Sequence, residues 1–138
     1  MEREEIKNYL PHREPMLLVD DVTMDNGITT GHYLVRGDEF FLQGHVPGYP
    51  VVPGVILCEI MGQCCCALML DVLPGRLTFY AGLDNVRFKN QVRPGDRVTV
   101  TARIVNRRGL TFFIDAEARV EEKICAKGRL IFMLVDKP

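Results

Sequence analysis

Two residues near the middle of the chain have the types and the spacing needed for acid–base chemistry. His45 lies in a segment, residues 38–52, that is too rich in proline and glycine for regular structure. Glu59 interrupts an otherwise apolar run from 55 to 70. Histidine has a reference pKa of about 6.5, so neutral imidazole is available as a base near pH 7. A buried carboxyl is expected to have a raised pKa and to keep a proton that it can donate.

Other polar or flexible positions near Glu59 fit a supporting role. Gly54 begins the expected helix, where N–H groups lack intrahelical acceptors and the dipole favours negative charge, so its N–H is a candidate oxyanion donor. Gln63 lies four residues after Glu59 on the same helix face. It is expected to orient the carboxyl, to hold a water, or to serve only as a structural partner. His32, on a predicted strand, is expected to be an ordinary surface or packing residue.

The elements that position these residues follow from hydrophobic periodicity. Pro53 suits the first turn of a helix, and residues 55–70 are apolar all the way round, which predicts a helix that is buried on every side. Strict apolar–polar alternation over 97–105 and 111–120 predicts half-buried antiparallel strands. We expect the remaining elements to be a short helical turn at 2–9 and strands at 16–25, 29–37, 77–90 and 123–136.

One long apolar helix and about six strands are best packed as an α+β domain, with a curled antiparallel sheet around the helix. The length favours a single domain over residues 1–138. One such sheet covers only part of the helix. The uncovered side would expose a large apolar patch, so a second copy of the chain is expected to cover it.

Composition narrows the function classes. The chain is 47% hydrophobic and 25% charged with a formal net charge of −1, which is typical of a globular protein and gives no argument for nucleic acid or a membrane surface. The charged N-terminus has no apolar signal segment, and five cysteines, three of them consecutive, fit reduced core residues better than a zinc site. We therefore expect a cytoplasmic protein. The apolar run around Glu59 is at the short limit for a bilayer span, and a glutamate at the centre of the bilayer costs about 2.5–3.5 kcal/mol. We therefore expect this run to be a buried helix of a globular domain and not a membrane span.

Three separated motifs resemble those of the β-hydroxyacyl-(acyl-carrier-protein) dehydratases of bacterial fatty-acid synthesis, of the short, non-isomerising type. They are "LPHREPMLLVDDV" (10–22), "FFLQGHVPGYPVVPGVILCEIMGQ" (40–63) and "LDNVRFKNQVRPGD" (83–96), in the order found in the family. The second motif has one extra residue before its Gly-His pair. The resemblance covers nearly the whole chain and implies a hot-dog fold.

The resemblance assigns the catalytic histidine to His45 and the catalytic acid to Glu59, and it implies a structural role for His12. It implies dehydration of 3-hydroxyacyl thioesters to trans-2-enoyl thioesters, without a metal or an organic cofactor, on an acyl chain carried by the phosphopantetheine of acyl carrier protein. It also implies that the two residues of one site come from different subunits of a homodimer, alone or within a trimer of dimers. Val46, Val52 and Cys64–Cys66 differ from the residues usual in the family. These differences are expected to reshape the acyl tunnel and to leave His45 and Glu59 unaffected.

Four basic residues are expected either to dock the acidic carrier protein or to form a solvated face: Arg87, Lys89, Arg93 and Arg97. Three other functions remain open. An enoyl isomerase would use the same pair, a hot-dog thioesterase would use a carboxylate to activate water, and an acyl-binding subunit would need neither residue. The presence of both His45 and Glu59 favours the dehydratase.

Overall fold

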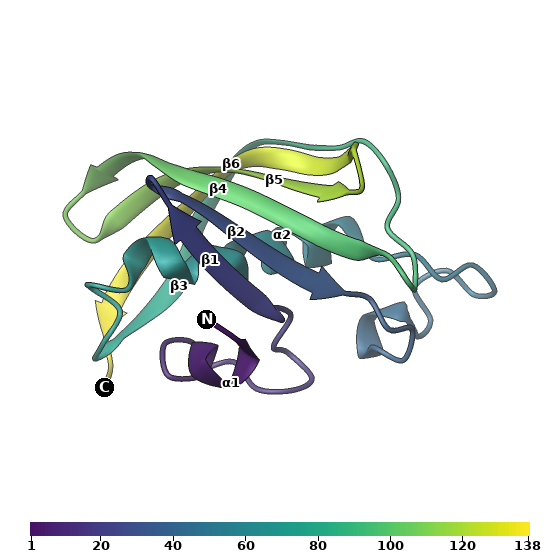
Figure 1. Ribbon diagram of the computed structural model, residues 1–138, viewed down its shortest axis with the longest axis horizontal. Helices are drawn as coiled ribbons and strands as arrows, with labels where there is room; N and C mark the ends of the chain where they lie inside the picture. Colours follow the sequence, from purple (N-terminus) through teal and green to yellow (C-terminus); the bar gives the residue numbers. More distant parts are fainter.

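One antiparallel sheet curves around a central helix in the computed structural model, which describes residues 1–138 (Figure 1). The strand order is β1-β2-β4-β5-β6-β3, which confirms the predicted architecture. The strands are β1 (Asp21–Asp25), β2 (Ile28–Leu34), β3 (Arg76–Phe88), β4 (Arg97–Arg108), β5 (Thr111–Val120) and β6 (Lys123–Asp136). The helices are α1 (Arg3–Ile6), α2 (Gly54–Cys64) and the short 3₁₀ helices η1 (Phe40–Leu42) and η2 (Cys65–Met69).

Alternation along the strands determines which face of the sheet meets the helix. In β4, Val98, Val100 and Ala102 are buried, while the side chains between them are partly exposed on the other face. Strands β5 and β6 have the predicted bounds, and β1 joins β2 through Asn26-Gly27, both with positive φ as in a two-residue hairpin turn. The inner face of the sheet and the helix form one core of 35 buried residues.

The central helix differs from the prediction in one way. It is α-helical only to Cys64 and continues as 3₁₀ helix through Met69. Most of its residues are buried or half-buried and Val55 in the first turn remains 74% exposed, as expected for a helix that one sheet covers only in part. No helix in the chain is both long and apolar enough to cross a membrane.

The segment before β1 is not the strand that its apolar residues predicted. Leu17, Leu18 and Val19 are buried, but the ladder with β2 begins only at Asp21. Their backbone is instead bonded to the Gln63 side chain, which donates to Met16 O and accepts from Leu18 N–H. The predicted strand 16–25 is therefore too long at its start, and the reason is a contact with the central helix that periodicity does not reveal.

Strand β3 forms one edge of the sheet and is unusually apolar for an edge. Phe79, Leu83 and Phe88 are each about half exposed. With Val55 at the start of α2, they form an uncovered apolar margin along one side of the molecule. The expectation that one sheet leaves part of the helix uncovered is thus confirmed.

Candidate active site

Glu59 lies on the wall of a mostly apolar cavity of about 410 Å³ between the central helix and the edge of the sheet. The helix contributes its second and third turns, the segment before the first strand closes one end, and β3 and β6 form the opposite wall. The residues that line it are Leu10, Pro11, His12, Glu59, Gly62, Gln63, Cys66, Met69, Leu77, Thr78, Phe79, Tyr80 and Phe132. An apolar cavity with a few converging polar groups is the usual form of a ligand site.

Gln63 fixes the carboxyl in this cavity. Its Nε2 donates to Glu59 Oε2 at 2.8 Å and to Met16 O at 2.8 Å, and its Oε1 accepts from Leu18 N–H at 2.6 Å. All its partners can only donate or only accept, so the orientation of the amide is determined. The contact that the four-residue spacing predicted is present, and Gln63 also ties the segment at 16–18 to the helix.

His12 is the second partner of the carboxyl, and the sequence reasoning did not assign it to the site. Its Nε2 lies 3.3 Å from Glu59 Oε2. This hydrogen bond, opposed by burial and assisted by Gln63, holds the pKa of Glu59 below its usual range. The expectation of a raised pKa is therefore wrong within one chain, because it considered burial without the donors. Only the "LPHR" motif signals His12 in the sequence, since no periodic pattern links it to Glu59.

His45 lies apart from this cavity. It is exposed on the loop that follows η1, which projects from the body of the molecule at the right of Figure 1. Its Nδ1 is 3.1 Å from Val51 O. Because a carbonyl only accepts, Nδ1 carries the proton and Nε2 keeps a free lone pair. No hydrogen bond or ion pair joins His45 to Glu59, so one chain alone does not bring the predicted pair together.

Gly54 lies in a second hollow of about 540 Å³, next to Val51, Phe88 and Lys89. The first helical hydrogen bonds to Pro53 O come from residues 56 and 57, so the N–H of Gly54 lies before them and is free for another acceptor. A Cβ at Gly54 would lie 3.1 Å from the Phe88 ring. The position thus admits glycine with a close approach to its backbone, as an oxyanion donor requires.

The four basic residues do not form one group. Lys89 lines the hollow beside Gly54, where Lys123 joins it. Arg93 stacks on Tyr49, which belongs to the same loop as His45, at 4.2 Å from the ring centre. By contrast, Arg87 stands opposite Lys127 in the sheet, and Arg97 is 3.9 Å from Asp21.

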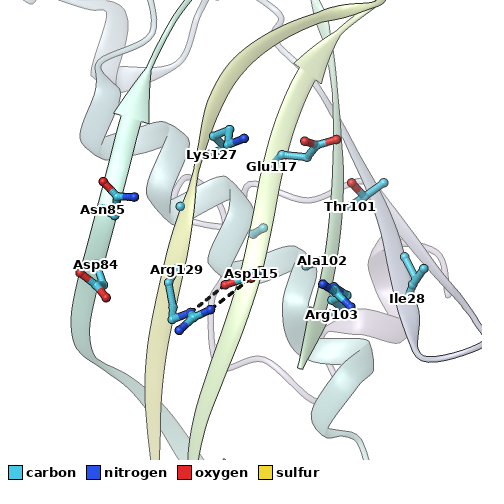
Figure 2. A pocket seen from close by; sticks show the side chains of 12 residues that line it. Ile28, Asp84, Asn85, Thr101, Ala102, Arg103, Asp115, Glu117, Lys127 and Arg129 are labelled. Atoms are coloured by element: carbon cyan, nitrogen blue, oxygen red, sulfur yellow. Dashed lines mark hydrogen bonds and ion pairs between the residues drawn. The ribbon is translucent and has the colours of Figure 1, made fainter. Parts of the chain in front are cut away.

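A third hollow, also of about 540 Å³, lies on the outer face of the sheet. Figure 2 shows Asp115 of β5 and Arg129 of β6 bonded side by side, with Asp84 on β3 and Arg103 on β4 to either side. Arg129 donates to both carboxylate oxygens of Asp115, at 2.8 and 3.3 Å. These charges neutralise one another across neighbouring strands, which is the ordinary state of a solvated face.

The cysteines contribute no nucleophile to these cavities. All five are free and buried. Burial raises the pKa of Cys66, which lines the cavity of Glu59, to about 12. The thiols therefore behave as apolar packing residues, as the sequence predicted.

Comparison with known proteins places the chain in a family. Residues 10–129 match the FabA-like domain. The chain is 46% identical to the 3-hydroxyacyl-[acyl-carrier-protein] dehydratase FabZ of Lactococcus lactis subsp. cremoris (strain SK11) over 134 residues, which cover 94% of this chain and 92% of that protein.

Solved structures with low sequence identity share the fold. The dehydratase heterocomplex ApeI:P from Xenorhabdus doucetiae aligns with a TM-score of 0.80 and 18% identity over 96% of this chain and 91% of that one. The fluoroacetyl-CoA thioesterase FlK aligns with a TM-score of 0.69 and 20% identity over 83% and 90%. At this identity the likeness concerns the fold alone. The motifs, the family match and the FabZ relative together establish that this chain belongs to the FabA-like hot-dog family, as a FabZ-type 3-hydroxyacyl-[acyl-carrier-protein] dehydratase.

Proposed function

We propose that His45 and Glu59, supplied by two different chains, dehydrate 3-hydroxyacyl groups on acyl carrier protein to trans-2-enoyl groups in fatty-acid synthesis. The observation that carries this proposal is the state of Glu59. Its Oε2 accepts from Gln63 and lies 3.3 Å from His12 Nε2, whereas Oε1 has no partner within the chain and is not fully buried. A carboxyl fixed at one oxygen and free at the other, in an apolar cavity, suits proton transfer to a bound substrate.

The reaction requires a base, an acid and a donor for the oxyanion. His45 Nε2, left free by the bond between Nδ1 and Val51 O, would take the C2 proton. Negative charge then develops on the thioester oxygen, which the N–H of Gly54 at the helix N-terminus would stabilise. The C3 hydroxyl leaves as water with the proton from Glu59 Oε1, and the C2–C3 double bond forms.

A homodimer would complete this site. Within one chain, Gly54 lines one hollow and Glu59 another, and His45 lies on an exposed loop that lines neither, with no direct contact between the catalytic pair. The apolar margin of Val55, Phe79, Leu83 and Phe88 lies on the uncovered flank of the helix and sheet. A second copy related by a two-fold axis would bury that margin on both chains and bring the two half-sites together twice. Whether these dimers assemble further into a trimer of dimers is measurable from the molar mass in solution.

Acyl carrier protein is the proposed carrier of the substrate, docked by the basic residues Arg87, Lys89, Arg93 and Arg97. Lys89 and Arg93 are the strongest candidates, because they lie beside the hollow of Gly54 and the loop of His45. Lys89→Ala should raise the KM for carrier-bound substrate and leave a pantetheine thioester unaffected, and added salt should act in the same way. An equal response of both substrates would leave these residues as a solvated face.

We also propose that the whole chain acts as one domain in the cytoplasm. One core includes residues from Ile6 at one end to Leu134 at the other. Five free cysteines fit a reducing compartment, where thiols persist.

The dehydratase is separated from a thioesterase by one assay. Purified protein is incubated with crotonyl and 3-hydroxybutyryl thioesters, and enoyl absorbance and free thiol are followed together. We expect reversible interconversion of the two thioesters without release of thiol. Steady appearance of thiol with no change in enoyl absorbance would support the thioesterase instead.

A further inference from the structure

His12 makes a contact with Glu59 that the proposed reaction does not yet use. The imidazole Nε2 lies 3.3 Å from Glu59 Oε2, and both side chains are 27% exposed at the rim of the cavity. We infer that His12 is a positioning residue of the reaction, which holds Oε2 so that Oε1 faces the substrate and stabilises the carboxylate left after its proton has gone. This inference depends on the role proposed above for Glu59.

The backbone around His12 is unusually well fixed for a segment without regular structure. The Arg13 guanidinium donates to the carbonyl oxygens of Lys7, Leu10 and His12 at 3.2, 3.0 and 2.7 Å. On the other side, the N–H groups of residues 16 and 17 donate to Arg13 O, and Gln63 binds the backbone at 16 and 18. The backbone that carries the imidazole is therefore held on both sides, which favours a fixed position for a residue that orients another side chain.

The atoms available on the two side chains determine how they interact. His12 Nδ1 is buried and has no hydrogen-bond partner, so a proton on that atom would be left unsatisfied. The proton accordingly belongs on Nε2, from which it is donated to Glu59 Oε2. Oε2 accepts this bond whether or not Oε1 carries a proton. His12 thus holds the same geometry before and after proton transfer and interacts more strongly with the charged state.

No other group in the cavity is placed to do the same. Cys58 precedes Glu59 on the helix, Cys66 lies on η2 and Tyr80 lies on β3. Burial raises the pKa of each of these three groups, so they are neutral near pH 7. The Tyr80 hydroxyl donates to Cys58 O and is not bonded to the carboxyl. Of the side chains from the surrounding elements, only His12 and Gln63 bring a polar nitrogen to the carboxyl of Glu59.

The test compares three substitutions at His12 by kcat, KM and pH profile with crotonyl pantetheine. His12→Ala should lower kcat by about 10- to 100-fold with little change in KM, since a misplaced catalytic group has effects of this size. The pH-rate limb that reports Glu59 should move to higher pH, because the main cause of its lowered pKa is lost while burial remains. His12→Gln, whose amide N–H replaces Nε2–H, should recover most of the rate. His12→Asn, whose N–H replaces Nδ1, should not.

The controls distinguish this inference from a structural role and from the proposed function. His32→Ala removes a histidine that pairs with Asp21 on the sheet, away from the cavity, and should leave kcat and the pH profile unchanged. If His12→Ala impairs folding, equal rates for the Gln and Asn variants would still overturn the inference. A His12→Ala enzyme with a normal kcat and a normal pH profile would also overturn the inference, provided that Glu59→Gln is inactive. If Glu59→Gln is itself active, the proposed function fails first.

Discussion

The cavity that contains Glu59 and the hollow on the outer face of the sheet each contain a carboxyl side chain, but in different surroundings. Glu59 has apolar neighbours and two donors on one of its oxygens. Asp115 has Arg129 on both of its oxygens, and each of these two side chains is more than 40% exposed. The first carboxyl keeps a free oxygen in an apolar space, whereas the second is satisfied by a permanent cation in contact with water.

This difference explains why cavity size alone does not point to the candidate active site. The outer hollow is the larger of the two, at about 540 Å³ against about 410 Å³. Water screens its charges, and an arginine does not release its proton, so neither Asp115 nor Arg129 is suited to proton transfer. A carboxyl in an apolar cavity, partnered by a histidine, has interactions that change strongly with its protonation state.

The largest effect is expected from substituting the acid and the base. Glu59→Gln and His45→Ala should each lower turnover by a factor of about 10² or more, and the double variant should be little worse than the poorer single one. Steady-state hydration of crotonyl thioester measures this. The matched control in the outer hollow is Asp115→Asn, which should retain normal turnover. An equal loss of turnover in Asp115→Asn would contradict the functional difference between the two regions.

The second effect is recovery of activity in mixed dimers. Inactive His45→Ala and Glu59→Gln chains, unfolded and refolded together, should regain about a quarter of wild-type activity, because half of the dimers are mixed and each of those has one intact site. Differently tagged chains allow the mixed dimer to be isolated and assayed. Mixed dimers that remain inactive would show that each chain supplies its own pair.

A smaller effect is expected from Gln63→Ala, which is measured as stability. This substitution leaves the buried Leu18 N–H and Met16 O without partners, so the free energy of unfolding should fall by about 1–3 kcal/mol. Urea denaturation at constant protein concentration provides the value. Unchanged stability would mean that water replaces the amide.

The smallest effect is expected on the outer face. Arg129→Ala removes the paired guanidinium of Asp115, but both groups are exposed, and such pairs contribute less than about 1 kcal/mol. The same urea measurement should therefore place this variant close to wild type, and 0.5 M salt should reduce the difference further. A larger loss of unfolding free energy than in Gln63→Ala would mean that the ion pair on the outer face is important for the stability of the sheet.

Much of the fold and part of the site could be predicted because their signals are local. Alternation in 111–120 predicts β5 with its observed bounds, since a strand places every second residue on one face. The catalytic candidates could be named because a histidine on a proline- and glycine-rich loop and a glutamate in an apolar helix are unusual in their own segments. The end of the α-helix at Cys64 could not be predicted, because the apolar run continues through the 3₁₀ turn.

The sequence by itself determined the strand pattern, the apolar central helix and the presence of a histidine and a glutamate suited to acid–base chemistry. Only the tertiary structure decided the surroundings of Glu59. Gln63 bonds to residues at 16 and 18, which are 47 and 45 positions away in the chain, and His12 comes from the same distant segment. Those contacts lower a pKa that burial alone would raise. The reason is physical: periodicity records which face of an element is buried, whereas the ionisation of a carboxyl depends on which donors the fold brings within hydrogen-bond distance.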